Sequence, residues 1–499
     1  MKKHPERYIV AAMMIGLFMA SLDNTIVSAS LNSIIEKIGG FEKMSWVFTA
    51  YMLASTSTLL IFGKLSDIYG RKLFFLIGIA VFVGASALCG TAQTIEQLIA
   101  YRALQGIGAG ALLPISFTII FSVFNDPTKA AKMTGIFAAV FGLSSVLGPQ
   151  LGTWISEGMG WRWCFYINVP LGIASFLILT FALKETKATE KPKIDYLGTI
   201  LLIITVISLM LVFEFGGKDY EWGSKQILGL AGISIIGLIL FIFVEKKASE
   251  PILNLSMFKH KMIAGTSFIV FCQGVLMFSA ITYIPIFATG VLGREGSNGL
   301  LTPMMLSLMI GASLGGMLIT KFAFRSFYLF SMAGGIVASY LLFSVNQDTD
   351  YYKVILIMIV LGLLAIGPLM SVAQNAVANA VPKDQLGSVN SIVAFFRNIG
   401  GIFGASIMAT IVNNSLESDI KEKLSHASIP ADKLEQLSNP EVLLRATDQI
   451  PAQVVAILRD SLSSAISHGF LFALGVSAIG FLSAFLVGKA RYDVSKLGK

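Results

Sequence analysis

Asp23 is a carboxylic acid inside an apolar stretch that runs from Tyr8 to Ile35. A second charged side chain, Arg102, lies in the apolar stretch 97–122. An ionisable group inside a bilayer costs at least about 2.5–3.5 kcal/mol, so each needs a partner or, for the acid, a proton. Burial favours the neutral acid, whereas a neighbouring arginine favours the carboxylate. We therefore hypothesise that Asp23, beside Arg102, binds and releases a proton; the alternative is a permanent pair that only orients helices.

Other polar, methionine and aromatic residues of the apolar segments are candidates for lining a substrate cavity. Such a mixture is typical of pockets that accept many hydrophobic compounds. Because the chain holds 20 methionines and 36 phenylalanines, core packing or lipid contact is the alternative for the apolar members. Arg397 and Asn398 either face the cavity or anchor their helix. The candidates are Asn24, Gln105, Gln273, Met277, Tyr283, Phe396, Arg397 and Asn398.

The composition places these residues in a membrane protein. Of 499 residues, 55% are hydrophobic and 13% are charged, which excludes an ordinary soluble domain. A helix needs about 20 apolar residues to cross a hydrocarbon core of about 30 Å, where backbone groups must bond within the helix. The sequence therefore predicts an all-α fold of fourteen transmembrane helices. The spans lie near 8–35, 44–65, 73–93, 97–122, 131–155, 163–183, 195–215, 227–245, 262–290, 300–320, 326–345, 352–379, 388–414 and 464–488.

Lysine and arginine gather on one side of the predicted helices. Well over half of the 37 basic residues fall on the side that includes both ends of the chain. Since cationic loops are retained in the cytoplasm, we expect both termini to be cytoplasmic. The net charge of +8 then reflects this asymmetry and an anionic inner leaflet. We expect contact with membrane lipids and no binding of nucleic acid.

The sequence offers no candidate metal site or enzyme centre. Cys89, Cys164 and Cys272 lie in or at the edge of apolar spans and lack metal-ligand spacing, so we expect neither disulfides nor bound metal. The glycines of 106–111 are spaced as in a nucleotide loop, but no strand precedes them. We therefore expect no cofactor, and an ion gradient as the source of energy.

The two halves of the chain repeat one pattern. Small residues recur at steps of three and four along the fifth span and again along the thirteenth, on one face of each helix. The recurrence favours two bundles that rock against each other, and ordinary helix packing is the alternative. We predict a six-helix bundle at 1–190, a two-helix insert at 191–258 and a second six-helix bundle at 259–499. The latter contains an extracellular segment, 415–463, with short amphipathic helices.

Five different short motifs follow one another along the first 172 residues of the chain. They are LDNTIV (22–27), GKLSDIYGRK (63–72), YRALQGIGAGALLP (101–114), GLSSVLGPQLG (142–152) and WRWCFYINVPLG (161–172). Together they resemble the motifs of the major facilitator superfamily, and within it of the fourteen-helix drug:proton antiporters of bacteria. The resemblance implies a cytoplasmic gate and an antiporter motif. The gate residues would be Gly63, Asp67, Gly70, Arg71 and Lys72, and the antiporter motif Gly142, Gly148, Pro149 and Gly152.

These observations predict a secondary transporter and no enzyme. We expect proton-coupled efflux of amphipathic hydrophobic compounds, such as drugs, dyes or cationic antiseptics, by a monomer in the bacterial cytoplasmic membrane. An exporter or flippase of a lipid or lipid-like metabolite is one alternative. The other is a membrane receptor or scaffold that keeps the fold but transports nothing.

Overall fold

The computed structural model describes residues 5–124, 126–185, 194–217, 219–293, 298–424 and 452–491. Within these residues the long elements are all helices, and fourteen helical segments are long and apolar enough to cross a membrane. The predicted all-α fold with fourteen spans is confirmed. The helices are α1 (Pro5–Ile38), α2 (Trp46–Tyr69), α3 (Arg71–Thr91), α4 (Ile95–Val123), α5 (Pro127–Gly158), α6 (Trp163–Tyr166), α7 (Asn168–Ala182), α8 (Tyr196–Phe215), α9 (Lys225–Glu245), α10 (Lys261–Ile286), α11 (Asn298–Leu318), α12 (Phe324–Phe343), α13 (Tyr351–Val360), α14 (Gly367–Ala378), α15 (Leu386–Leu424) and α18 (Ala452–Ala484).

Four of the fourteen spans are not single regular α-helices, and one of them is the thirteenth, in which a 3-10 turn at Lys383–Gln385 precedes α15. The sixth consists of α6 and α7, and the ninth ends in a π-helical turn at Phe287–Val291 after α10. In the twelfth, a π-helical segment at Leu361–Ile366 joins α13 to α14. Such π segments widen the helix locally and often occur at functional sites.

Side-chain caps define several helix starts. The Thr94 side chain accepts a hydrogen bond from the Gln97 amide at the start of α4. Asp126 caps α5 in the same way, and Pro127 occupies the first position of that helix. Both features satisfy or remove amide donors that a first helical turn leaves unpaired.

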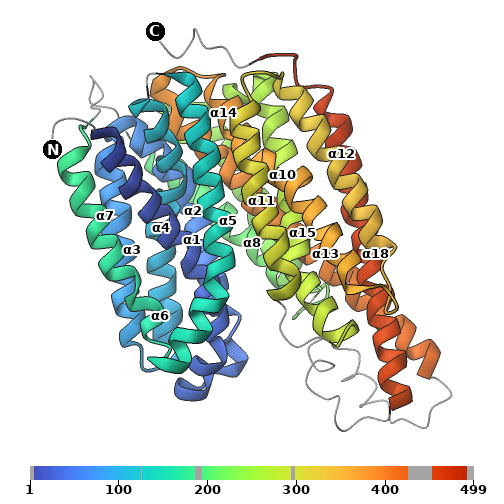
Figure 1. Cartoon of the computed structure of the whole chain (residues 1–499). Coiled ribbons are helices and arrows are strands. Elements are labelled where there is room, and N and C mark those ends of the chain that lie inside the picture. Colours follow the sequence, from blue (N-terminus) through green and yellow to red (C-terminus); the bar gives the residue numbers. More distant parts are fainter. Residues whose placement is uncertain are drawn as a thin grey trace.

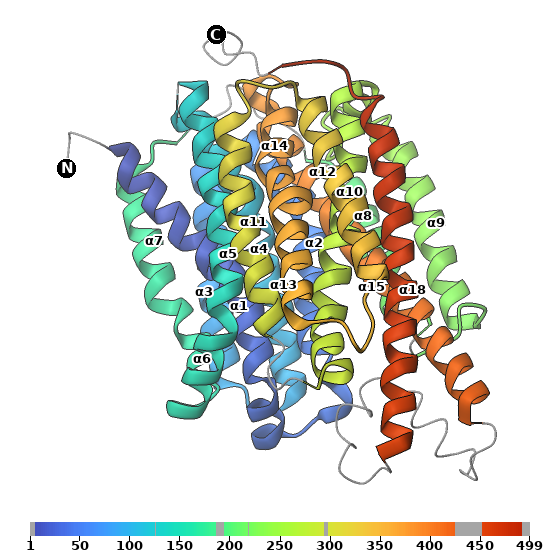
Figure 2. The same ribbon diagram turned by 45° about the vertical axis from the view of Figure 1, so that its right-hand side comes forward.

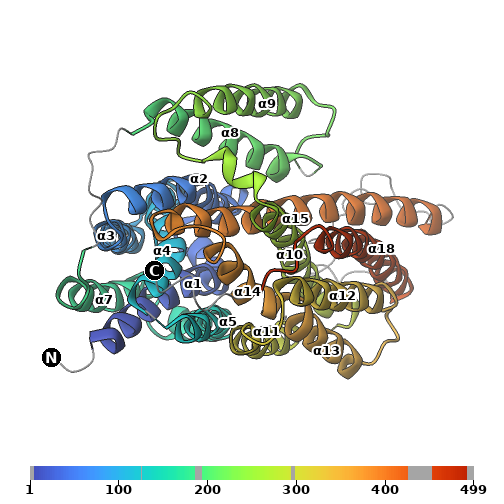
Figure 3. The same ribbon diagram turned by 90° about the horizontal axis from the view of Figure 1, so that it is seen from above.

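The helices form two sets with a pair beside them. Helices α1–α7 lie together, as do α10–α18, and α8 and α9 lie against the outside of this arrangement (Figure 3). The start of α1 and the end of α18 lie at the same end of the molecule, here called the terminal end (Figure 2). The two sets meet near the terminal end and diverge toward the opposite, far end (Figure 1). The division at 190 and 258 stays a prediction that this arrangement supports.

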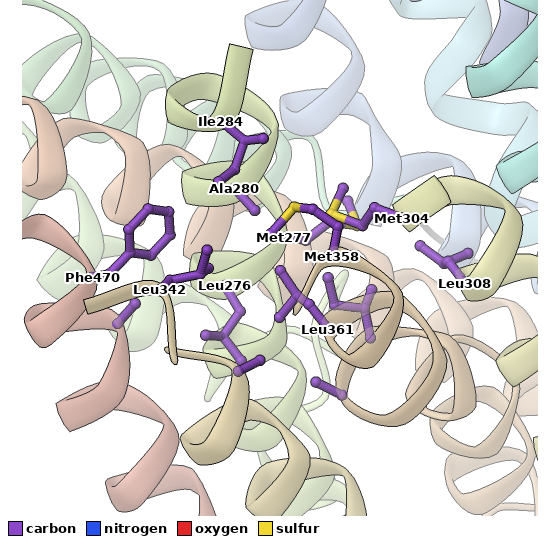
Figure 4. Packing of buried hydrophobic residues seen from close by; sticks show 14 of the residues in the cluster. Leu276, Met277, Ala280, Ile284, Met304, Leu308, Leu342, Met358, Leu361 and Phe470 are labelled. Carbon is purple, nitrogen blue, oxygen red and sulfur yellow. The ribbon is translucent and has the colours of Figure 1, made fainter. Parts of the chain in front are cut away.

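Each set supplies most of the residues of one buried apolar cluster. Leu276, Met277 and Ala280 of α10 pack with residues of α11 and α13 in the largest cluster (Figure 4). A separate cluster joins Met13, Phe75 and further residues of α1, α3, α4, α5 and α7. A third cluster joins Leu53 and Leu60 of α2 to Val389 and Ile392 of α15, so apolar packing also crosses between the two sets.

Two predicted segments differ from the structure. The second span was predicted to end near residue 65, but α2 continues to Tyr69, so that only Gly70 separates α2 from α3 and most of the motif at 63–72 is helical. The segment 415–463 is also partly helix: α15 extends to Leu424 and α18 begins at Ala452. The two extensions are joined where Lys423 Nζ contacts Asp460 Oδ2 at 2.9 Å. Residues 425–451 of the segment predicted to form short amphipathic helices lie outside the described residues.

Candidate functional site

Asp23 lies in a polar network inside the first set of helices. Its side chain has no solvent exposure, and its Oδ2 accepts a hydrogen bond from Arg102 Nη1 in an ion pair. Its Oδ1 accepts two amide hydrogen bonds, from Gln105 Nε2 at 2.7 Å and from Asn168 Nδ2 at 2.9 Å. Both carboxylate oxygens therefore face donors only, which is the arrangement of an ionised acid.

Arg102 has many partners besides Asp23. Its Nε donates to the Val47 carbonyl at 3.1 Å and its Nη1 to Gln105 Oε1 at 2.7 Å. Its Nη2 donates to Asn24 Oδ1 at 3.3 Å, and its guanidinium lies 4.2 Å from the centre of the Tyr51 ring. A cation over an aromatic face is favourable. The guanidinium is thus fixed whether or not Asp23 is ionised.

Five helices build this network. Asp23 comes from α1, Tyr51 from α2, Ser86 from α3, Arg102 and Gln105 from α4, and Asn168 from the start of α7. Ser86 Oγ accepts a hydrogen bond from Gln105 Nε2 at 2.6 Å. The candidate Gln105 therefore lies in the Asp23 network and is fully buried, and Asn24, which is half-buried, contacts the edge of this network.

Asp67 connects the two sets at the terminal end. Its Oδ1 accepts from the Gly387 amide at 2.8 Å, and its Oδ2 accepts from the Ser388 amide at 2.7 Å and from Ser388 Oγ at 2.9 Å. These amides belong to the first turn of α15, where the helix dipole favours a negative charge. Asp67 therefore caps a helix of the opposite set.

Arg71 adds to the same contact. It lies 3.8 Å from Asp67 Oδ1, and its Nη2 donates to the Lys383 carbonyl in the connection before α15. Its neighbour Lys72 turns away and donates from Nζ to the Thr180 carbonyl at 2.6 Å within its own set. Gly70, with φ of +117°, provides the backbone conformation at the break between α2 and α3.

Glycines bring helices of the two sets into direct backbone contact. A Cβ at Gly63 of α2 would clash with Ser391 and with the Gly387 carbonyl of α15. On the other side, a Cβ at Gly316 of α11 would lie 2.7 Å from the Ala131 carbonyl of α5. Both crossings lie near the terminal end, where small residues permit close approach.

Among the described residues, three further side-chain hydrogen bonds cross between the sets. Asn375 Nδ2 donates to Thr134 Oγ1 at 2.5 Å, and Asn390 Nδ2 donates to Thr118 Oγ1 at 3.2 Å. All four of these residues are fully buried. The third, from Asn398 to Thr56 at 3.2 Å, lies deeper along α15. The terminal end is thus closed by charged, polar and backbone contacts together.

The antiporter motif splits its small residues between two neighbours. Gly142 approaches α11, where an added Cβ would lie 3.0 Å from the Met305 carbonyl. Gly148 and Gly152 instead pack on α1, and a Cβ at Gly148 would clash with Thr25. Pro149 lies inside α5 between these two glycines and has no amide donor for the helix. The motif therefore connects α1, which bears Asp23, to a helix of the opposite set.

Arg397 is the buried cation of the second set. It is 5% exposed, and its Nε lies 3.3 Å from Gln273 Oε1 of α10. Gln273 in turn donates from Nε2 to the Ile366 carbonyl at 2.7 Å, at the end of the π-helical segment. Phe396 is half-buried, with its ring centre 6.0 Å from that of Phe258.

Met277 and Tyr283 belong to the apolar core of the second set in this conformation. Both are at most 5% exposed and lie in the cluster shown in part in Figure 4. Of the eight cavity candidates, the structure thus joins Gln273 directly with Arg397 and Gln105 with Asp23. Asn398 contacts the opposite set, and Met277 and Tyr283 pack among apolar side chains.

Sequence reasoning missed several partners of the charged residues. Asn168 could have been identified as a candidate partner, because its amide side chain lies within the apolar span 163–183. Ser86 could not, since serines are frequent in the spans and most bond to their own helix, as Ser116 does with the Leu112 carbonyl. The amides of Gly387 and Ser388 carry no side-chain signal at all.

Comparisons with known proteins agree with this architecture. Residues 13–405 match the model of the Major Facilitator Superfamily. Multidrug resistance protein 3 of Bacillus subtilis is 38% identical over 98% of this chain and 96% of its own length. The Multidrug transporter protein MdtP of the same organism is 36% identical over 96% of this chain and 92% of its own.

A solved structure supports the fold independently. The human organic anion transporter MFSD10 covers 95% of this chain and 100% of its own, with a TM-score of 0.62 and 14% identity. That level of identity bears on the fold alone. Given the family match, the two near full-length relatives and its fourteen spans, the chain belongs to the major facilitator superfamily of multi-pass membrane transporters.

Proposed function

We propose that this transporter exports amphipathic hydrophobic compounds in exchange for protons that bind Asp23. The names of its Bacillus relatives support multidrug efflux. The proposed coupling rests on one observation: the carboxylate of Asp23 is fully buried and accepts hydrogen bonds from three donors, one of which is the arginine of its ion pair. A carboxyl group held in this way is the residue type that proton-coupled carriers use inside a membrane.

Protonation of Asp23 would break its network. A proton on either oxygen would face an N–H donor, so a hydrogen bond would be lost on Oδ1 or the ion pair on Oδ2. Arg102 would stay in place, because Val47, Gln105 and the Tyr51 ring continue to hold it. The released element is therefore α1, which carries Asp23.

Helix α1 can transmit this release to α5. Gly148 and Gly152 pack directly on Thr25 and Ile26, so a displacement of α1 must act on α5. Helix α5 in turn contacts α11 of the opposite set through Gly135 and Gly142. Close-packed crossings of this kind have a few discrete arrangements, which suits a two-state carrier.

The basic residues support a cytoplasmic location of the terminal end. With that orientation, the Asp67 contact closes the cytoplasmic side and the divergence in Figure 1 is outward. The ionised Asp23 then corresponds to the step after cargo release and before proton uptake from outside. Inward opening would follow protonation, and proton release to the cytoplasm would accompany binding of the next compound.

Everted membrane vesicles test the proposal. A proton gradient is first generated across the vesicle membrane. One dye is then added, either ethidium, rhodamine B or the uncharged Nile red. Proton movement is followed by the quenching of a fluorescent base. We expect dye-dependent proton movement with the unmodified chain and none with Asp23→Asn. Glu96→Gln is the matched control: it makes the same change at an exposed acid, paired with Lys43, and should leave coupling intact.

Other outcomes would favour the alternatives. Translocation of a fluorescent phospholipid in proteoliposomes, without any response to the dyes, would favour a lipid exporter. Absence of both would favour a receptor or scaffold. Unchanged dye-driven proton movement in Asp23→Asn would contradict the role of Asp23 and leave the permanent pair as its explanation.

A further inference from the structure

The two buried arginines differ in charge balance. Arg102 forms an ion pair with Asp23. Arg397 has no ion pair within the described residues, and its Nη2 is buried without a hydrogen-bond acceptor. A buried guanidinium donor without an acceptor loses its hydration and gains nothing in return.

Arg397 is held in position from two directions. Gln273 accepts from its Nε at 3.3 Å and is itself fixed by the Ile366 carbonyl at 2.7 Å. The backbone of Arg397 lies directly against α10, as shown by the clash that a Cβ at Gly274 would make with the Arg397 carbonyl. The guanidinium is therefore oriented by the fold, while the buried Nη2 keeps a donor that no acceptor uses in this conformation.

Anchoring of a helix does not account for this arrangement. A glutamine or methionine could pack on Gln273 without a buried charge. Arg397 also lies eleven residues beyond Leu386, about 16 Å into α15, which is too deep for the side chain to reach the surface from a helix end. The adjacent residue, Asn398, contacts Thr56 of the first set, so this turn of α15 lies where the two sets meet.

We propose that Arg397, oriented by Gln273, binds a carboxylate of the transported compound. A guanidinium matches a carboxylate in charge and in planar geometry, and two parallel hydrogen bonds can form. This inference rests on the proposed function and names the substrate class. It narrows the range of transported compounds expected from the sequence. Asp23 is already paired with Arg102, so it does not balance the positive charge of Arg397. That charge repels permanent cations.

Rhodamine B and its ethyl ester test the proposal, because they share one ring system and differ in the free carboxylate. Binding of each dye to the purified full chain is measured by fluorescence anisotropy. We expect the chain to bind rhodamine B at least roughly tenfold more tightly than the ester, the lower bound for hydrogen bonds to a charged group. Arg397→Gln should weaken rhodamine B binding and bring the ratio close to one.

Two further variants keep the result interpretable. Arg397→Lys retains the charge without the planar fork and should keep part of the preference. Arg325→Gln makes the same change as Arg397→Gln at the terminal end, where Arg325 lies over the Phe485 ring, and should keep all of it.

Three results would overturn the carboxylate site: equal binding of the two dyes by the unmodified chain, no binding of either, or an equal loss of both in Arg397→Gln. Proton movement driven by Nile red in vesicles is a separate readout, because Nile red is uncharged and has no carboxylate. If it persists, the proposed function stands although the carboxylate site has failed.

Discussion

Replacing Asp67 with asparagine should shift the transporter away from the conformation described here. The carboxylate accepts hydrogen bonds from two first-turn amides of α15 and from Ser388 Oγ, at 2.7 to 2.9 Å. Asparagine offers one acceptor and turns an NH₂ group toward the donors. Loss of a charged acceptor costs about 2 kcal/mol, which lowers the ratio of closed to open terminal ends roughly 30-fold.

Spin labels across the contact measure this shift. Lys129 and Lys321 are exposed on the two sets at the terminal end and can be replaced by labelled cysteines. The native cysteines are all buried, which favours selective labelling. Double electron–electron resonance measures the distance between the two labels. In Asp67→Asn, a larger fraction of the molecules should have a long distance between the labels than in the parent protein.

The matched control is Glu250→Gln at the same end. Glu250 pairs with Lys64 at 2.9 Å, and this pair joins α2 to the connection after α9, not to the second set. The control should keep the parental distances. If Asp67→Asn gives the same distances as Glu250→Gln, the closing role of Asp67 is refuted.

Two glycine substitutions test the helix crossings. Gly63→Val should clash with Ser391 and lengthen the same label distance, whereas Gly84→Val, whose added Cβ meets nothing within 4 Å, should not; equal distances in both would contradict the crossing. Gly148→Ala should clash with Thr25 and reduce stability by about 1–3 kcal/mol in thermal unfolding. Thr25→Ala should restore part of that loss, and an unchanged unfolding temperature of the single variant would refute the packing argument.

The helices were predictable because span length follows directly from the solvent. Twenty or so apolar residues must form a helix in a bilayer, so all fourteen spans were found from the sequence. The ends were harder. Helix α2 continues through Lys64 and Asp67 to Tyr69, since charged residues end the apolar pattern without ending the helix.

The site was predictable only where a side chain violates the pattern of its span. Asp23 and Arg102 stand out as charges, and the structure places them in contact. Met277 and Tyr283 do not stand out in this way, because the same residue types fill cores and line cavities. The partner of Asp67 was beyond sequence reasoning, since it is the backbone of a distant helix.

The central claim is that Asp23 alternates between its ionised and neutral forms. Infrared difference spectroscopy of the purified transporter, with Asp23→Asn to assign the carboxyl band, measures this directly. We predict that a protonated carboxyl band from Asp23 appears as the pH is lowered and disappears when a transported dye binds. An Asp23 that stays ionised across the working pH range, with and without dye, would contradict the account.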